Sequence, residues 1–283
     1  FDNNINGLIS LLNSLDLKKK YNLVYSSSAC VYSSEKKSPY TEKSRIQPSN
    51  PYGQTKFIGE KILSKISGNN INVAILRYFN PAGAHKSALI GQNEKSKNTN
   101  LFSIVDEIAI KKRKKLEIFG NSHNTPDGTC VRDYFHVMDL ARAHSDSLLS
   151  LIRDRKNFTI NLGSGIPLSV LDIIHYYSKI NKINIPIKFS NKRINEASEV
   201  FSSITRAKQK IGWKPMHEIQ EICRSSLRWK RKLSKIMYCR ICQSKNINPI
   251  FNLGKQPLAN KYPKNEFEKK NEKLYAFYEI NHY

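Results

Sequence analysis

The sequence predicts an α/β protein with an open parallel sheet, and two kinds of segment support this. Short apolar runs such as Leu23–Tyr25 and Ile71–Leu76 have the length and composition of buried parallel strands. Between them lie longer segments whose apolar residues recur every three or four positions, as in amphipathic helices. Their alternation at this spacing is typical of βαβ units.

Composition narrows the class of protein. The chain has 283 residues, 39% of them hydrophobic, which is enough for more than one folded unit. It has no uninterrupted apolar run of about 18 residues, so we expect no membrane span. The five cysteines do not form a disulfide framework, and no basic-then-apolar leader follows Phe1. A cytoplasmic protein is the expectation.

The formal net charge of +24 raises nucleic acid as a partner. The lysines are spread along the whole sequence rather than gathered in one patch. The densest runs, Lys111–Lys115 and Lys230–Lys235, fall at the ends of predicted helices, where the helix dipole favours cations. The charge therefore predicts a solvated basic surface and no nucleic-acid partner.

The first elements place polar groups at one edge of the sheet. Residues 1–17 have the periodicity of an amphipathic helix that faces a sheet. Ser26–Ser28 follow the first strand, at the edge of an open sheet where ligands bind. Asn50 and Pro51 have the residue types of a helix cap and a first helical turn, so a helix is predicted to begin there.

Tyr52 and Lys56 lie one turn apart on this predicted helix. An ammonium beside a phenol stabilises the phenolate and lowers its pKa from about 10. Tyr52 could then take a proton from a substrate hydroxyl, with Ser28 relaying or orienting it. A second Tyr-x-x-x-Lys match, Tyr32 and Lys36, lies in a turn composition and is not expected to share a helix face.

The middle of the chain adds a loop and a charged strand. After the strand that ends at Leu76, residues 77–85 predict an ordered loop that presents Asn80 at the same edge. Helix 101–108 and strand 116–119 follow. Arg132 then interrupts an apolar run, and its planar fork suits a diphosphate. His136 is interpreted as structural, and Asp139 as the cap of the next helix.

Further elements complete the globular pattern, which ends near Ile236. We expect a strand at 159–162 and helices at 169–180, 205–213 and 219–232. Beyond Met237, Cys239 and Cys242 have the spacing of zinc ligands. One such pair is half of a four-ligand site, so zinc here is a weaker expectation.

Five stretches of this sequence resemble the UDP-glucose 4-epimerases of the extended short-chain dehydrogenase/reductase family. They are Ser-Ser-Ser-Ala-Cys-Val-Tyr (26–32), Tyr-Gly-Gln-Thr-Lys (52–56), Arg-Tyr-Phe-Asn-Pro-Ala-Gly-Ala-His (77–85), Ile-Phe-Gly-Asn (118–121) and Asp-Gly-Thr-Cys-Val-Arg-Asp-Tyr-Phe-His-Val-Met-Asp-Leu (127–140). The resemblance covers residues 1–231. It implies the C-terminal part of a Rossmann-like, doubly wound parallel sheet in residues 1–81. Residues 82–236 would be mainly a smaller α/β substrate part, with some strands returning to the first sheet.

The resemblance also implies the roles of individual residues. Tyr52 would be the catalytic base, tuned by Lys56 and assisted by Ser28. NAD would be bound by Asn3, Ser26, Tyr52, Lys56, Tyr78 and Phe79. A UDP-sugar substrate would be held by Ser28, Asn80, Asn100, Leu101, Arg132, Arg193, Glu196 and Val200. The implied reaction inverts C4 of a UDP-hexose through a transient 4-keto sugar, in an enzyme that is a homodimer when intact.

Two departures from the family pattern change these expectations. The glycine-rich first βα turn that holds the cofactor diphosphate is missing from this sequence, so we expect the chain alone neither to retain NAD nor to epimerise. Val200 stands where the family has a bulky tyrosine in its more restrictive members. The intact enzyme is therefore expected to accept UDP-N-acetylglucosamine as well as UDP-glucose.

Residues 237–283 resemble the N-terminal zinc-binding segment of sugar C-methyltransferases, through Cys-Arg-Ile-Cys (239–242) and Phe-Asn-Leu-Gly-Lys-Gln-Pro-Leu-Ala-Asn (251–260). Two joined reading frames would explain both resemblances, and a true fusion is the alternative. Two other functions stay open. A nucleotide-sugar 4,6-dehydratase would be expected to have Thr-Asp-Glu in place of Ser28-Ala29-Cys30, and a basic zinc module that binds nucleic acid would need a second ligand pair.

Overall fold

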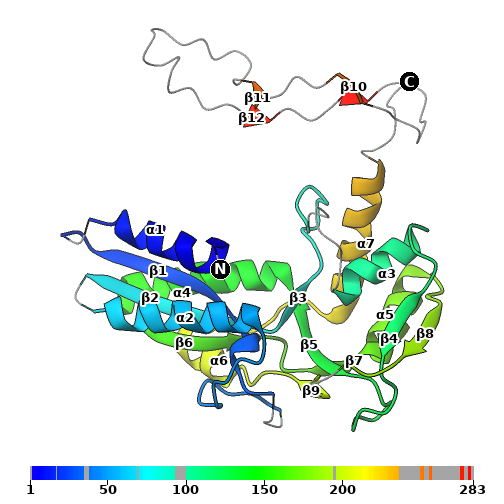
Figure 1. Ribbon diagram of the computed structural model, residues 1–283, viewed down its shortest axis with the longest axis horizontal. Coiled ribbons are helices and arrows are strands. Elements are labelled where there is room, and N and C mark those ends of the chain that lie inside the picture. The colour runs from blue at the N-terminus through cyan, green and yellow to red at the C-terminus, as the bar shows by residue number, and fades with distance from the viewer. Residues whose placement is uncertain are drawn as a thin grey trace. The chain divides into compact units, whose positions relative to one another are not determined.

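Three parallel strands form the sheet of the first part of the chain (Figure 1). They are β1 (Tyr21–Ser28), β2 (Ile71–Tyr78) and β6 (Phe158–Leu162), in the order β1-β2-β6. Both neighbouring pairs are parallel, which confirms the predicted fold class. β1 is longer than its apolar run because Ser26–Ser28 continue the pairing, opposite Leu76–Tyr78.

The computed structural model describes residues 2–16, 18–34, 38–68, 70–92, 100–193 and 196–235, with four short strands beyond them. Phe1–Lys230 form one compact unit and Arg231–Tyr283 another. The predicted division near residue 81 therefore falls inside the first unit and stays a prediction. Within the described residues, no helix has the length and apolar character needed to cross a membrane.

Helices cover both faces of the sheet. α2 (Pro51–Ile66) places Leu63 in the core with Val73 and Ile75 of β2. The alternate residues of β2, Ala74 and Leu76, pack in a second cluster with α4 (Val137–Asp154) and α6 (Thr205–Ile211). Because successive side chains of a strand point to opposite faces, α2 and α4 lie on opposite sides of β2.

The predicted N-terminal helix is only partly right. A π-helical turn at Asp2–Asn6 precedes α1 (Gly7–Asn13), which is shorter than the predicted 1–17. Leu8 packs in the cluster with Leu63, but Ile9 is 40% exposed although it was expected to face the sheet. The periodicity marked the helical region correctly, whereas the orientation of each side chain depends on the packing partner.

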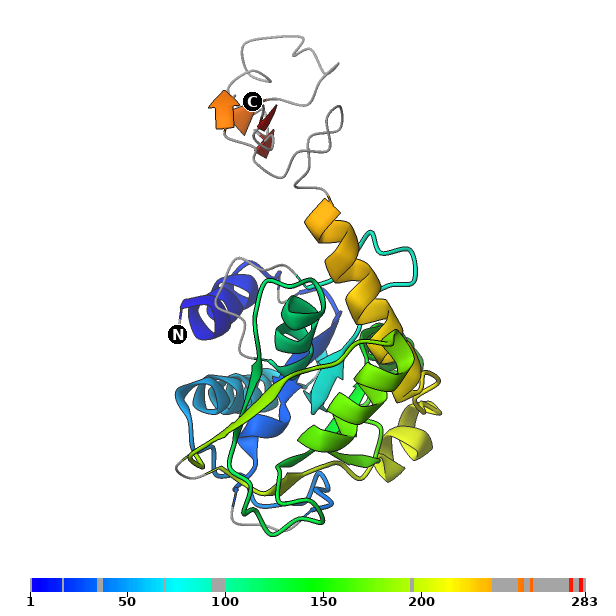
Figure 2. The same ribbon diagram turned by 90° about the vertical axis from the view of Figure 1, so that its right-hand side faces the viewer.

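A second lobe lies beside the sheet (Figures 1 and 2). One of its sheets contains β3 (Asn80–Ala82), β5 (Val131–His136), β7 (Pro167–Ser169) and β9 (Glu199–Val200). β4 (Leu116–Phe119) pairs with β8 (Ile187–Ser190), and the helices are α3 (Leu101–Ala109), α5 (Val170–Asn181) and α7 (Ile219–Lys235). A cluster that includes Phe102, Leu116, Tyr177 and Ile222 forms its core.

The starts of α5 and α4 show one helix cap that agrees with the sequence prediction and one that does not. Ser169 caps α5 in a reciprocal capping box with Asp172, at the predicted start. The prediction that Asp139 caps α4 is wrong, because the cap is His136, whose Nδ1 accepts a hydrogen bond from the amide of Met138. Asp139 lies one turn inside the helix and accepts hydrogen bonds from the amides of residues 216 and 217.

Beyond the end of α7 at Lys235, the structure describes four short strands of the second unit. β10 (Pro249–Phe251) pairs antiparallel with β13 (Ile280–Asn281), and β11 (Lys255–Gln256) pairs antiparallel with β12 (Tyr275–Ala276). Cys239 and Cys242 lie outside the described residues, so their expected zinc site stays a prediction.

Candidate active site

Tyr52 and Lys56 are placed by the first turns of α2. Asn50 caps this helix, and its Oδ1 accepts a hydrogen bond from the amide of Gly53 at 2.8 Å. Pro51 occupies the first turn, as predicted. Gly53 lies so close to the segment after β1 that a Cβ there would be 2.3 Å from the carbonyl oxygen of Cys30. This close approach holds the start of α2 against the C-terminal end of β1.

Tyr52 lies beside Ser28, as the sequence predicted. Its pKa is raised, first by burial and then by the nearby Cys30 thiol, while a hydrogen bond with the Ser28 side chain acts in the opposite direction. The raised pKa differs from the lowered value expected from Lys56. Desolvation outweighs the neighbouring cation, because Lys56 Nζ lies 5.6 Å from the centre of the Tyr52 ring.

Lys56 is a half-buried cation between two tyrosines. Its Nζ lies 5.6 Å from the ring centres of both Tyr25 and Tyr52, and burial lowers its pKa. Among the described residues, no carboxylate forms an ion pair with it. A desolvated ammonium of this kind is suited to bind the hydroxyl groups of a ligand that covers the sheet edge.

Ser26 and Tyr78 lie near the ends of the paired strands β1 and β2, where Ser26 is opposite Leu76 and Tyr78 is opposite Ser28. Burial raises the pKa of Tyr78, and a hydrogen bond with the Ser26 side chain acts in the opposite direction. Ser26 Oγ also lies 3.2 Å from Nε2 of His144 on α4. Since His144 Nδ1 donates to the carbonyl of Leu140, its Nε2 accepts the serine proton. Sequence reasoning missed His144, for which the only signal was a polar residue in an amphipathic helix.

A cavity of about 210 Å³ brings several predicted residues together. Its lining includes Ser28, Tyr78, Phe79, Asn80, Arg132 and Val200. Five of these residues lie on β1, β2, β3, β5 and β9, and Phe79 joins β2 to β3. Parallel pairing of β3 with β5, and of β5 with β9, gathers these side chains at one site.

Arg132 and Arg193 converge on Glu196. Arg132 Nη2 lies 3.3 Å from Glu196 Oε1, and Arg193 Nη1 lies 4.0 Å from the same oxygen. The Arg193 guanidinium also stacks 4.0 Å above the Phe119 ring. Two arginines that share one carboxylate leave a net positive charge beside the cavity, which suits an anionic ligand.

Three residues that were predicted to bind NAD or the UDP-sugar lie apart from Arg132, Arg193 and Glu196. Asn100 caps α3 by accepting from the Ser103 amide, and it lines another cavity, of about 520 Å³. Leu101 is the first residue of the same helix. Asn3 is exposed on the N-terminal π-helical turn, where its neighbour Asn4 donates to Thr55 of α2. Their predicted roles stay predictions.

A buried ion pair supports the site and was not predicted. Arg77 of β2 donates two hydrogen bonds to Glu60 of α2, at 2.9 and 2.6 Å. Ser27 donates to the same carboxylate, and Arg77 also donates to the hydroxyl of Tyr32. The network fixes α2, which carries Tyr52, to β1 and β2. The sequence signal was the charge of Arg77 at the end of an apolar strand.

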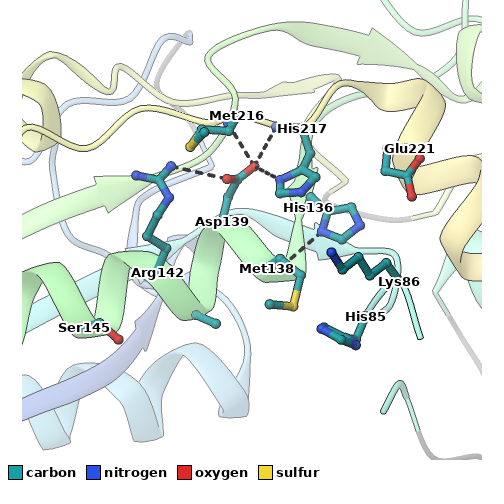
Figure 3. Close-up of a pocket in the computed structure, with 11 residues that line it drawn as sticks. His85, Lys86, His136, Met138, Asp139, Arg142, Ser145, Met216, His217 and Glu221 are labelled. Atoms are coloured by element: carbon teal, nitrogen blue, oxygen red, sulfur yellow. Dashed lines mark hydrogen bonds and ion pairs between the residues drawn. The ribbon is translucent and has the colours of Figure 1, made fainter. Parts of the chain in front are cut away.

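Another cavity, of about 480 Å³, lies at the start of α4 (Figure 3). His136 and His217 stack there with ring centres 4.4 Å apart, and Asp139 contacts the amide and ring of His217. His136 Nε2 lies 3.0 Å from the Ser225 hydroxyl. Since His136 caps α4 and its ring packs against that of His217, the structural interpretation of His136 is supported.

The residues at the sheet edge fit part of a dinucleotide site. The half-buried ammonium of Lys56 lacks an acidic partner among the described residues, and the 48% exposed Tyr52 borders it. Ser26 lies near the end of β1, and Tyr78 ends the adjacent strand β2. The described residues include no glycine-rich strand-to-helix turn of the kind that holds a cofactor diphosphate.

Comparisons with known proteins agree with this geometry. A family model described as GDP-mannose 4,6 dehydratase matches residues 1–226. UDP-glucose 4-epimerase 4 of Oryza sativa subsp. japonica is 40% identical, over 82% of this chain and 64% of the relative. UDP-glucose 4-epimerase of Bacillus subtilis is 37% identical, over 81% of this chain and 68% of the relative. The chain thus spans about two thirds of the length of these relatives.

Solved structures give the same result. UDP-glucose-4-epimerase from Stenotrophomonas maltophila, with bound NAD and formylated UDP-arabinopyranose, aligns with a TM-score of 0.81 and 36% identity. The match covers 83% of this chain and 71% of that structure. The enzyme from Bifidobacterium longum, in complex with NAD+ and UDP, aligns with a TM-score of 0.72 and 35% identity. By sequence and by fold, this chain belongs to the UDP-glucose 4-epimerase family of enzymes.

Proposed function

We propose that this chain supplies the catalytic residues and most of the sugar-binding residues of a UDP-hexose 4-epimerase that uses NAD. The observation that carries the proposal is the meeting of Tyr52, Ser28 and Lys56 at one sheet edge, next to a cavity lined by Asn80 and Arg132. The named activity of the relatives supports it.

In the proposed reaction, Tyr52 removes the proton from the 4-hydroxyl of the sugar, and Ser28 holds that hydroxyl in place. Bound NAD+ would supply the hydride chemistry at C4. The raised pKa of Tyr52 means that the phenol is protonated in the free chain, so a further positive charge at the site is needed to favour the phenolate. Lys56 is close enough to the Tyr52 ring to contribute to that field.

The nucleotide end of the substrate is assigned to Arg132, Arg193 and Glu196. The two guanidinium groups lie around one carboxylate, and a diphosphate would accept part of their hydrogen bonding. Binding energy at the nucleotide does not depend on which face of C4 reacts, so the 4-keto sugar can turn over while the nucleotide stays bound.

The test uses a chimaera, in which residues 1–231 replace the matching part of the Bacillus subtilis relative. Conversion of UDP-galactose to UDP-glucose is expected, and Tyr52→Phe should lower its rate by about 10²–10⁴-fold. Tyr21→Phe, at the far end of β1, is the matched control and should keep activity. The proposal is contradicted if the chimaera folds but is inactive. It is also contradicted if the Tyr52→Phe variant is as active as the unsubstituted chimaera. Release of a 4-keto-6-deoxy sugar would instead identify the dehydratase.

The same assay tests the nucleotide site. Arg132→Lys keeps the charge but loses the planar fork, so KM for UDP-galactose should rise while the pH dependence is unchanged. The unmodified chain, without the relative's portion, is expected to show no epimerisation and no retained NAD, since its sequence offers no glycine-rich diphosphate turn. Tightly bound NAD in the purified chain would contradict this.

A homodimer through α1 and α2 is part of the proposal. Ile9 and Leu11 of α1, and Ile58 and Ile66 of α2, are between 36% and 49% exposed. Apolar side chains exposed together on adjacent helices favour self-association. Light scattering of the chimaera should give twice the chain mass, and Leu11→Lys with Ile58→Lys should give the single mass. Residence in the cytoplasm and a zinc ion bound by Cys239 and Cys242 are also part of the proposal.

A further inference from the structure

Tyr25 of β1 lies under Lys56 of α2, and the proposed reaction gives it no role. The residue is 8% exposed and packs in the cluster of Leu8 and Leu63, on the face of the sheet that α2 covers. Lys56 Nζ lies over the Tyr25 ring, 5.6 Å from its centre. A buried aromatic ring is thus the floor on which the ammonium of Lys56 rests.

The ammonium lies between two rings of unequal exposure. Its distance to the centre of the Tyr52 ring is also 5.6 Å. The face of an aromatic ring attracts a cation within about 6 Å, and more strongly where water is excluded. Tyr52 is 48% exposed at the site, whereas Tyr25 is fixed by close packing in the core. Tyr25 is therefore the ring that can set where the cation lies.

The far end of the Tyr25 side chain is fitted against the backbone of α2. Its hydroxyl donates a long hydrogen bond, of 3.4 Å, to the carbonyl oxygen of Lys56. A Cβ at Gly59, one turn further along the helix, would overlap that hydroxyl. Glycine is unfavourable inside a helix, and the close approach of the phenol explains its presence at this position. The ring and the helix turn that carries Lys56 are held as one packed unit.

The carboxylate that would normally compete for Lys56 is already used. Glu60 follows Lys56 by four residues on α2, a spacing at which a lysine and a glutamate can pair. Both oxygens of Glu60 instead accept hydrogen bonds from Arg77, and Ser27 donates to one of them. A carboxylate partner would cancel much of the charge of the ammonium, whereas an aromatic face holds it without cancelling it.

Tyr25 also stays uncharged where the reaction would operate. Burial raises its pKa to about 12, and the charges of Glu60, Tyr52 and Tyr78 act in the same direction. The ring therefore does not become a phenolate that would compete with Tyr52 for the field of Lys56.

We propose that Tyr25 is a positioning residue, whose neutral ring holds the Lys56 ammonium beside Tyr52 so that the whole positive charge acts on the phenol. This inference rests on the proposed function, because it concerns how Lys56 supports Tyr52 as the base. Tyr25 acts through Lys56 and is not assigned a contact with the sugar.

Nuclear magnetic resonance of the full chain tests the placement of Lys56 directly. With lysine labelled at the ε carbon, the resonance lost in Lys56→Met identifies this residue. Its ε protons should be shifted upfield by the ring faces and should show nuclear Overhauser contacts to the Tyr25 ring. Tyr25→Leu should move the resonance toward that of the exposed Lys65. Tyr25→Phe keeps the ring and should keep the shift, as should Tyr21→Leu at the start of β1.

Kinetics of the chimaera test whether that placement matters. Tyr25→Leu should lower kcat about three- to tenfold with little change in KM for UDP-galactose, and Tyr25→Phe should keep kcat. In the Lys56→Met background, Tyr25→Leu should cause no further loss, since its effect passes through Lys56. Damage to packing alone would lower kcat by the same factor in both backgrounds.

The two readouts separate this inference from the proposed function. Absence of the contacts between Lys56 and the Tyr25 ring in the unsubstituted chain overturns the inference, and so does an unchanged Lys56 resonance in folded Tyr25→Leu. An equal loss of kcat with and without Lys56 also overturns it. The resonance measurement needs neither NAD nor a UDP-sugar. An inactive chimaera would therefore contradict the proposed function, while the placement of Lys56 by Tyr25 is still decided by the resonance.

Discussion

Arg77 and Glu60 form a buried ion pair with two hydrogen bonds, and each side chain is only 6% exposed. The pair joins β2 to α2, the helix that carries Tyr52. Glu60→Gln leaves the guanidinium buried without its counter-charge. Removing one partner of such a pair costs about 3–5 kcal/mol of unfolding free energy. Urea unfolding followed by circular dichroism measures the change.

The control for this prediction is an exposed pair. Arg224 lies 3.8 Å from Glu221 on α7, with 52% of its side chain exposed. Arg224→Gln should cost less than about 1 kcal/mol. Equal losses for Glu60→Gln and Arg224→Gln would show that the buried pair does not stabilise the site.

Gly53→Ala should disturb the active site although alanine favours helices. The added Cβ would meet the carbonyl of Cys30 at 2.3 Å, so α2 and the segment after β1 must separate. We expect a loss of about 1–3 kcal/mol in stability. Because that movement separates Tyr52 from Ser28, we also expect lower epimerase activity in the chimaera.

Gly68→Ala is the matched substitution. Nothing lies within 4 Å of a Cβ at Gly68, and its φ is not positive, so its stability and activity should be unchanged or slightly improved. Full activity of Gly53→Ala would mean that the contact with Cys30 does not set the position of Tyr52.

The burial of His136 leads us to expect that the unfolding free energy depends on pH. Burial, with a smaller contribution from His217, lowers the pKa of His136 to about 4, while Asp139 acts in the opposite direction (Figure 3). Between about pH 6.5 and pH 4, the unfolded chain binds a proton here and the folded chain does not. The unfolding free energy should therefore fall by about 2 kcal/mol through this group as the pH drops from 7 to 5.

His136→Asn isolates this contribution. Asparagine retains an acceptor for the helix cap but does not titrate, so the loss between pH 7 and pH 5 should be smaller by about 2 kcal/mol than in the unsubstituted chain. His175→Asn, at an exposed residue of α5, should leave the loss unchanged. Identical pH profiles for His136→Asn and the unsubstituted chain would contradict the assignment.

The small side chain of Val200 leads to a prediction about which UDP-sugars the intact enzyme accepts. It lines the cavity with Tyr78 and Asn80 and packs in the cluster of Val31, Tyr40 and Phe79. Val200→Tyr should fill space that an N-acetyl group needs, and lower kcat/KM for UDP-N-acetylglucosamine at least about tenfold relative to UDP-glucose in the chimaera. Such a ratio corresponds to about 1.4 kcal/mol. Val200→Thr keeps the shape of the side chain and should leave the ratio unchanged.

The sequence by itself determined the features that depend on near neighbours along the chain. Parallel strands followed from short apolar runs, and strand 116–119 was predicted with the bounds that the structure gives to β4. The cap at Asn50 and the start of a helix at Ser169 followed from residue type and spacing. The pairing of Tyr52 with Lys56 followed from one helical turn, because the geometry of a helix is the same in every protein.

Only the tertiary structure decided the contacts between distant segments. Tyr32 donates to Asn161, 129 residues away, and Arg132 meets Glu196 across 64 residues. The pKa of Tyr52 likewise depends on how deeply the ring is buried, which a motif does not encode. Sequence spacing fixes distances within an element, whereas distances between elements follow from how their apolar faces pack.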